Sequence, residues 1–241
     1  MMTIFTKEFN DFLNSLIGYV AISVFLTGVG LIMWLFPDTN VLDYGYATLE
    51  PVFTVGPYLL LFLVAAITMK SFAEEKRSGT LELLYTLPFH TLDILLGKYL
   101  AALSLVMVAL VPTLLYYVSI YQLGNPTGNL DASGILGSYL GVLLLSSVFI
   151  AIGMFCSALT ENQIVSFVLS AFLSFLIYQG FEAIATIDVW GSWSYYLEQL
   201  GIMFHYENIS RGVLDAKDFA YFIGTSFLFL LMTLLTLESK R

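Results

Sequence analysis

The stretch EEKRSGTLELLYTLPFHTLDILLGK, residues 74–98, interrupts a chain that is otherwise overwhelmingly apolar. It carries charges of both signs together with Gly79 and Pro88, and it lies between apolar runs at about 52–71 and 95–121 that are long enough to cross a bilayer. We name this stretch the elbow. Because charged residues are costly in the hydrocarbon core, we expect the elbow at a membrane surface.

The elbow contains the pattern of a short amphipathic helix. Its apolar residues recur at the i, i+3 and i+4 spacing of one helix face, and a carboxylate falls in the first turn, where the helix dipole favours it. A serine, a glycine hinge and a threonine supply the start of the helix, and a proline ends it. The residues concerned are, in order, Ser78, Gly79, Thr80, Leu81, Glu82, Leu84, Tyr85 and Pro88. From periodicity alone, this helix could be a knob for a cytoplasmic partner or an ordinary interfacial loop.

The composition decides the class of protein. Of the 241 residues, 59% are hydrophobic and only 11% are charged, and the mean hydropathy is +0.86. A soluble domain is typically about 25% charged. A soluble chain of this size cannot hide so much apolar surface, so the composition predicts an all-α, polytopic membrane protein.

Charge and cysteine content exclude other classes. The net charge of −9 comes without the basic patch that nucleic acid would need, so we expect no nucleic-acid partner. The single cysteine, Cys156, excludes a disulfide framework. His90 and His205 lie far apart with no cysteine or carboxylate at ligand spacing, so no metal site is predicted.

Six apolar runs predict six membrane-spanning helices in a single permease-like domain over residues 1–241. An apolar stripe over residues 1–15 predicts an N-terminal interfacial helix. The aromatic-rich residues 188–217 predict short helices at the outer face, and residues 74–90 predict the cytoplasmic segment of the elbow. The runs lie at about 16–36, 52–71, 95–121, 134–159, 164–187 and 218–237.

Lysine and arginine positions predict the orientation. With the N-terminus in the cytoplasm, seven of the nine basic residues are cytoplasmic, and only Arg211 and Lys217 lie outside. We therefore expect both termini and the elbow on the cytoplasmic side.

Three features within the spans predict local geometry. Pro57 and Pro112 fall inside spans, where we expect them to kink the helices. Gly137 and Gly141 form a G-x-x-x-G motif, which lets two helices approach closely. The motif alone fits a contact within the chain as well as a contact between two chains.

The residues of the elbow resemble the coupling segment of ABC-2-type permeases. That pattern reads roughly E-(K/R)-x-x-G-T-L-E-x-L-x-x-x-P, followed by G-K. The matching positions here are Phe72, Glu74, Glu75, Lys76, Gly79, Thr80, Leu81, Glu82, Leu84, Pro88, Gly97 and Lys98. Stretches such as YQLGNPTGNLDASGILGSYLG and ISRGVLDAKDFAYF look like the gliding-motility-associated permeases of Bacteroidota.

The resemblance implies a function for the chain. It implies a permease subunit of an ATP-driven transporter in the bacterial inner membrane, without ATPase activity of its own, and no G-x-x-x-x-G-K-[ST] motif occurs in the sequence. ATP and Mg would be bound by a separate cytoplasmic ABC ATPase. A second permease chain, either identical or different and larger, would complete the complex within the lipid bilayer. The residues expected to couple to the ATPase are Glu74, Glu75, Lys76, Arg77, Gly79, Thr80, Leu81, Glu82, Leu84, Tyr85 and Pro88.

Two other functions stay open from the sequence. One is an ABC-2 permease for lipid, polysaccharide or drug efflux, or for metalloenzyme maturation. The other is an ion-coupled carrier or channel, which would need ionisable residues along a path, for example Glu161 and Glu182.

Overall fold

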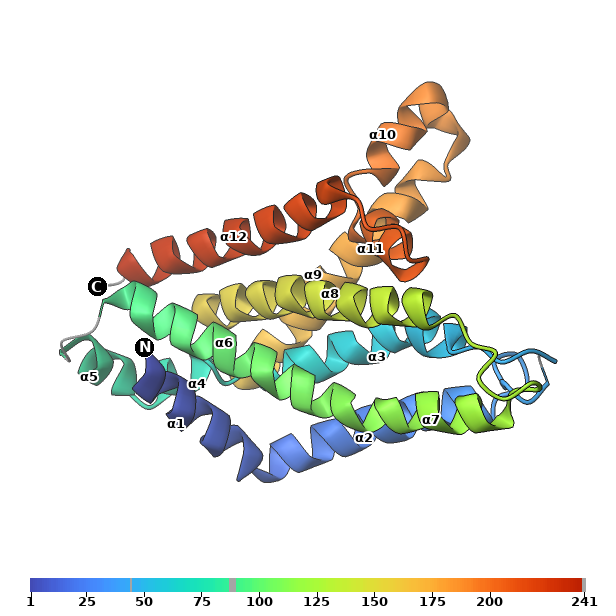
Figure 1. Cartoon of the computed structure of the whole chain (residues 1–241). Coiled ribbons are helices and arrows are strands. Elements are labelled where there is room, and N and C mark those ends of the chain that lie inside the picture. The colour runs from blue at the N-terminus through green and yellow to red at the C-terminus, as the bar shows by residue number, and fades with distance from the viewer. Residues whose placement is uncertain (44, 87–89, 240–241) are drawn as a thin grey trace.

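The computed structural model describes residues 1–43, 45–86 and 90–239, and over this part of the chain all regular secondary structure is helical (Figure 1). The elements are α1 (Met2–Leu13), α2 (Leu16–Trp34), α3 (Glu50–Thr68), α4 (Ala73–Arg77), α5 (Thr80–Thr86), α6 (Thr91–Leu110), the 3-10 turn η1 (Val111–Thr113), α7 (Leu114–Leu123), α8 (Ala132–Leu159), α9 (Gln163–Ala185), the 3-10 segment η2 (Asp188–Trp193), α10 (Ser194–Glu198), α11 (Ile202–Ser210) and α12 (Ala216–Glu238).

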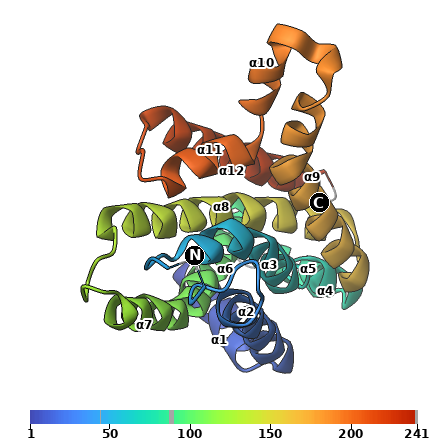
Figure 2. The same ribbon diagram turned by 90° about the vertical axis from the view of Figure 1, so that its right-hand side faces the viewer.

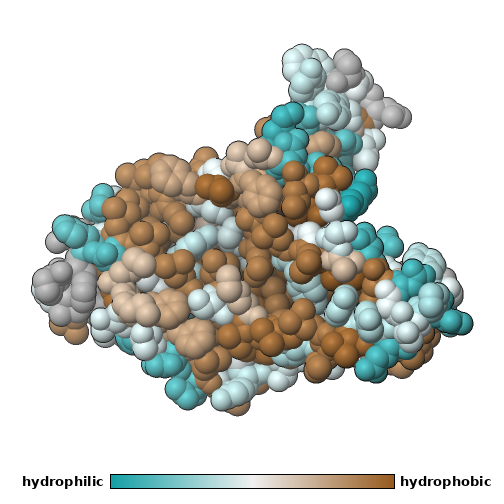
Figure 3. Space-filling model, viewed as in Figure 1, coloured by the Kyte–Doolittle hydropathy of each residue, from teal (hydrophilic) through white to brown (hydrophobic). Residues whose placement is uncertain are grey.

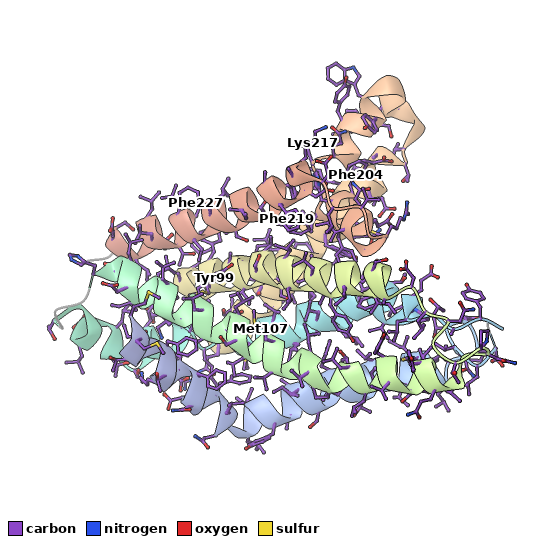
Figure 4. All side chains as sticks on the ribbon, in the orientation of Figure 1. Tyr99, Met107, Phe204, Lys217, Phe219 and Phe227 are labelled. Carbon is purple, nitrogen blue, oxygen red and sulfur yellow. The ribbon has the colours of Figure 1, made fainter. Side chains whose placement is uncertain are left out.

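Six stretches are long and apolar enough to cross a membrane, which confirms the predicted fold class. Apolar side chains cover the middle of the molecule and polar residues gather at its two ends (Figure 3). Phe227 of α12, for example, is 66% exposed and points away from the bundle (Figure 4). Exposed apolar side chains of this kind suit a lipid environment. The stretches are Leu16–Trp34, Glu50–Arg77, Thr91–Leu123, Ala132–Leu159, Gln163–Ala185 and Ala216–Glu238.

Helix α8 is the centre of the bundle, and α3, α6, α9, α11 and α12 pack around it (Figures 1 and 2). Small residues on α8 make this packing possible. Gly153 meets the Thr68 side chain of α3, and Ser147 lies 3.2 Å from Ser226 of α12, measured between the hydroxyl oxygens. Tyr99 of α6 donates a hydrogen bond to the Ser147 carbonyl at 3.3 Å (Figure 4). These polar groups of α6, α8 and α12 are therefore satisfied between helices.

The N-terminal helix is separate from the first span. Ser15 ends α1 and begins α2, because its Oγ accepts a hydrogen bond from the Gly18 amide at 3.0 Å. Helix α1 then packs against α6 rather than extending α2. An interfacial position for α1 stays a prediction.

The two prolines differ in their effect. Pro112 lies in η1, one 3-10 turn that separates α6 from α7, so the third span is interrupted there. Helix α3 runs without a break through Pro57. A kink at Pro57 therefore stays a prediction.

Different elements lie at the two ends of the bundle. The N-terminus, the end of α12 and α5 lie at one end, while α10 and α11 lie at the other (Figure 1). We name these the α5 end and the α11 end.

Candidate functional site

The elbow begins at a sharp break between α3 and α4, and α8 holds this break in place. The Ser157 hydroxyl of α8 accepts hydrogen bonds from the amides of Phe72 at 3.0 Å and Ala73 at 3.1 Å. The same hydroxyl donates to the Met69 carbonyl at 3.2 Å. The first amides of a helix have no partner within it, and one buried hydroxyl satisfies two of these amides at the start of α4.

A buried ion-pair cluster fixes α4 to two other helices. The Lys98 ammonium of α6 lies 2.7 Å from the Glu75 carboxylate of α4 and 2.7 Å from the Glu8 carboxylate of α1. The Lys98 side chain is only 3% exposed, and its ammonium also lies 5.4 Å from the centre of the Phe72 ring. A buried ammonium is tolerated only where carboxylates compensate its charge, so these three residues depend on one another.

Gly97, the neighbour of Lys98, permits the approach of α1. A Cβ atom on Gly97 would lie 3.1 Å from the Met1 carbonyl and 3.2 Å from the Ile4 Cβ. The glycine removes the steric obstacle and the lysine supplies the charge. These two roles together explain why a Gly-Lys pair follows α5 in the sequence.

The corner between α4 and α5 requires a glycine. Gly79 has φ of +69°, in the left-handed region that other residues avoid. Ser78 closes the same turn, because its hydroxyl donates to the Glu74 carbonyl at 2.8 Å. Helix α5 then leaves the bundle, with Leu81 buried and Leu83 64% exposed.

The structure divides the predicted coupling residues into two groups. Glu75 and Leu81 are buried, and the partly buried Lys76 donates a hydrogen bond to the Ala158 carbonyl of α8. The exposed group consists of Glu74, Arg77, Gly79, Thr80 and Glu82. The side chains of Leu84 and Tyr85, and the whole of Pro88, lie outside the described residues.

The G-x-x-x-G motif packs within the chain. A Cβ on Gly137 would lie 3.0 Å from the Ile209 carbonyl of α11, and one on Gly141 would lie 3.2 Å from the Ile209 Cγ2. This face of α8 is covered by α11 within the chain, and whether the motif also forms a contact between chains stays a prediction.

Comparison with known protein families decides the identity of this arrangement. The sequence matches the family described as ABC-2 family transporter protein over residues 2–237. The chain belongs to this family. No curated protein matches it.

Membership of the ABC-2 family fixes the general role. The chain is a multi-pass membrane protein and the membrane component of an ABC-2 transporter. Membrane subunits of this family contain no ATPase domain and bind no cofactor, so an ATPase subunit is the implied partner. Among the described residues, no group of three or more His, Cys, Asp or Glu side chains is placed to hold a metal ion.

Sequence reasoning missed the residues that anchor the elbow. The family pattern includes Lys98 but assigns it no role, and no motif in the sequence marks Glu8 or Ser157 as a site residue. The available signal was a lysine in an apolar run, which requires a carboxylate partner. The sequence does not show which carboxylate is near, because Glu8 lies 90 residues before Lys98.

Proposed function

We propose that the exposed side of α4 and α5 is the surface on which the cytoplasmic ATPase docks. The observation that carries this proposal is the contrast within the elbow. Glu75 is held inside the protein by Lys98, while Arg77 at the end of α4 is exposed, as are Glu82 and Leu83 on α5, the short helix that projects from the bundle. A projecting helix with a firmly anchored base can transmit a push from a partner into the spans.

The contacts that anchor α4 determine how a force on α5 is transmitted to the membrane spans. Movement of α5 acts on α4, and α4 is tied to α8 through Ser157 and Lys76 and to α6 and α1 through Lys98. Binding of ATP would thus shift the balance between two arrangements of packed helices, with α8 at their centre.

The α5 end is the cytoplasmic end in this proposal, and the membrane is the bacterial inner membrane. The distribution of lysine and arginine supports this orientation, because Lys7, Lys70 and Lys98 line one cavity together with Thr80 of α5, and Lys76 and Arg77 belong to α4. A second permease chain, identical or larger, completes the transporter.

Gliding motility is the process we propose for the complex. The support is the resemblance of loops at the α11 end, including residues 121–141 and 209–222, to gliding-associated permeases. Efflux of a lipid, polysaccharide or drug is the alternative. Deleting the gene separates them, since loss of colony spreading with normal drug tolerance and envelope composition supports gliding, and the reverse supports efflux.

The docking surface is tested by reversing exposed charges without touching the anchors. In the variant Arg77→Glu/Glu82→Lys, we expect co-purification of the ATPase to fall at least about tenfold, because two charges on the contact surface become repulsive. Lys217→Glu, a charge reversal at the α11 end, is the matched control and should leave co-purification unchanged. Undiminished co-purification and unaltered ATP turnover in the double variant would refute the proposed surface.

A further inference from the structure

A cavity of about 400 Å³ opens at the α11 end, far from the elbow. It lies where the beginnings of α3 and α8 meet α9 and α11. This volume falls within the range of small-molecule sites. Because the elbow and its anchors do not contribute to it, the cavity is separate from the proposed ATPase surface.

Aromatic side chains form the inner part of this cavity. Phe53, Tyr178 and Tyr206 line it, and both tyrosines are only 2% exposed. The rings of Tyr178 and Tyr206 meet edge to face, with their centres 6.3 Å apart. The Tyr206 hydroxyl donates to the Phe53 carbonyl at 2.7 Å, and burial raises the pKa of this phenol well above its ordinary value, so it stays neutral.

The Tyr178 hydroxyl is different, because it makes no hydrogen bond within the part of the chain that the structure describes and its oxygen keeps some accessible surface. A tyrosine hydroxyl on a buried side chain normally finds a partner. Tyr178 is buried by its neighbours and lines the cavity, so a molecule in the cavity would supply the missing contact.

The charges around the cavity are predominantly negative. Its charged lining residues are three carboxylates and one guanidinium, Glu50, Asp131, Glu207 and Arg211. Arg211 is engaged with Glu207 at 2.7 Å. Hydrogen bonds from the Gly134 amide and the Ser133 hydroxyl lower the pKa of Asp131, which keeps this carboxylate ionised.

The predominantly negative charge of the lining disfavours an anionic ligand. It provides no attraction for a neutral polyol. A cation is attracted both by the carboxylates at the rim of the cavity and by the faces of the aromatic rings. We propose that this cavity binds an organic ammonium group, with Tyr178 accepting its hydrogen bond or lying against its methyl groups.

The experiment uses the full chain in nanodiscs of phosphatidylglycerol, which carries no amine, and titrates choline by calorimetry. We expect saturable binding, and binding at least about tenfold weaker for the neutral isostere of choline in which carbon replaces nitrogen. Glu207→Gln and Tyr178→Leu should each weaken choline binding several-fold, because the first removes a carboxylate and the second removes the aromatic ring against which the methyl groups lie. Asp43→Asn, an exposed carboxylate outside the cavity, is the matched control and should have no effect.

The result that overturns the proposal is equal binding of choline and its isostere, or no saturable binding of choline. Because Glu207 lies at the exposed rim, its variant tests the charge contribution even if the Tyr178 variant does not fold. Adding phosphatidylethanolamine to the nanodiscs identifies the source of the amine. Competition with choline indicates a lipid headgroup, and an unchanged affinity indicates a soluble amine.

Discussion

The Lys98 ammonium and the Glu75 carboxylate lie 2.7 Å apart, with side chains that are only 3% and 12% exposed. This ion pair joins the third span to the base of the elbow. Glu8 adds a second carboxylate from α1 at the same distance. The elbow is therefore built into the interior of the protein at its base, while Glu82 and Leu83 on α5, which we name its tip, are exposed.

Removing the central charge should destabilise the protein. We expect Lys98→Met to lower the free energy of unfolding by about 3 kcal/mol, because Glu75 would be left buried without a counter-charge. Unfolding in mild detergent measures this change. Lys70→Met, a partly exposed lysine at the same end, should cost less than about 1 kcal/mol. Equal losses in the two variants would contradict the assigned role of Lys98.

The hydroxyl of Ser157 should be essential and that of Ser166 dispensable. Ser157→Ala leaves the amides of Phe72 and Ala73 without an acceptor, so we expect a loss of about 2 kcal/mol. Ser166 is also fully buried, but its hydroxyl has no partner among the described residues. Ser166→Ala should therefore be neutral or slightly stabilising. Thermal unfolding of both variants in one detergent makes the comparison, and a more harmful Ser166→Ala would refute the anchoring scheme.

Gly79 should tolerate asparagine better than a β-branched residue. Its φ of +69° strains any side chain, and we expect Gly79→Val to cost about 1 kcal/mol or more. Asparagine adopts this conformation more readily, so Gly79→Asn should be closer to the wild type. ATPase co-purification should follow the same order, because the corner sets the direction of α5. Gly224→Val is the control for the added side chain, because Gly224 lies at an open position on α12 and does not have a positive φ. If Gly224→Val lowers co-purification of the ATPase as much as Gly79→Val does, the corner at Gly79 does not determine ATPase binding.

Gly137 should act within one chain rather than between two. Gly137→Leu would force a side chain against the Ile209 carbonyl, and we expect the free energy of unfolding to fall by about 2 kcal/mol. The number of permease chains in the purified complex should not change. A dissociated complex with unchanged unfolding of the single chain would show that this face of α8 forms an interface between chains.

The sequence predicted the elements better than their contacts. Composition and run length were enough for an all-helical bundle with six spans, because lipid permits few alternatives. The start of α5 also followed from local chemistry, since Gly79 has the positive φ expected of a glycine hinge. Residue patterns indicate which backbone conformation is favoured locally. The six spans and the start of α5 depend mainly on this local preference.

The anchors of the elbow depend on distant parts of the chain. Glu75 was expected to face the ATPase together with Arg77, but the structure places it beside Lys98. Both residues are charged and belong to the same short helix, so the sequence does not distinguish the buried one from the exposed one. The contacts of Lys98 on α6 and Ser157 on α8 distinguish them, and these contacts depend on how the helices pack in three dimensions.

The central claim is that the tip of the elbow contacts an ATP-hydrolysing subunit. Its most direct test is a photo-reactive amino acid placed at Leu83, which is 64% exposed on α5, and a second one placed at Leu214, which is 57% exposed at the α11 end. After irradiation of intact cells, we predict an ATPase adduct from position 83 and none from position 214. Lipid adducts alone at position 83, or an equal yield of ATPase adduct from both positions, would contradict the claim.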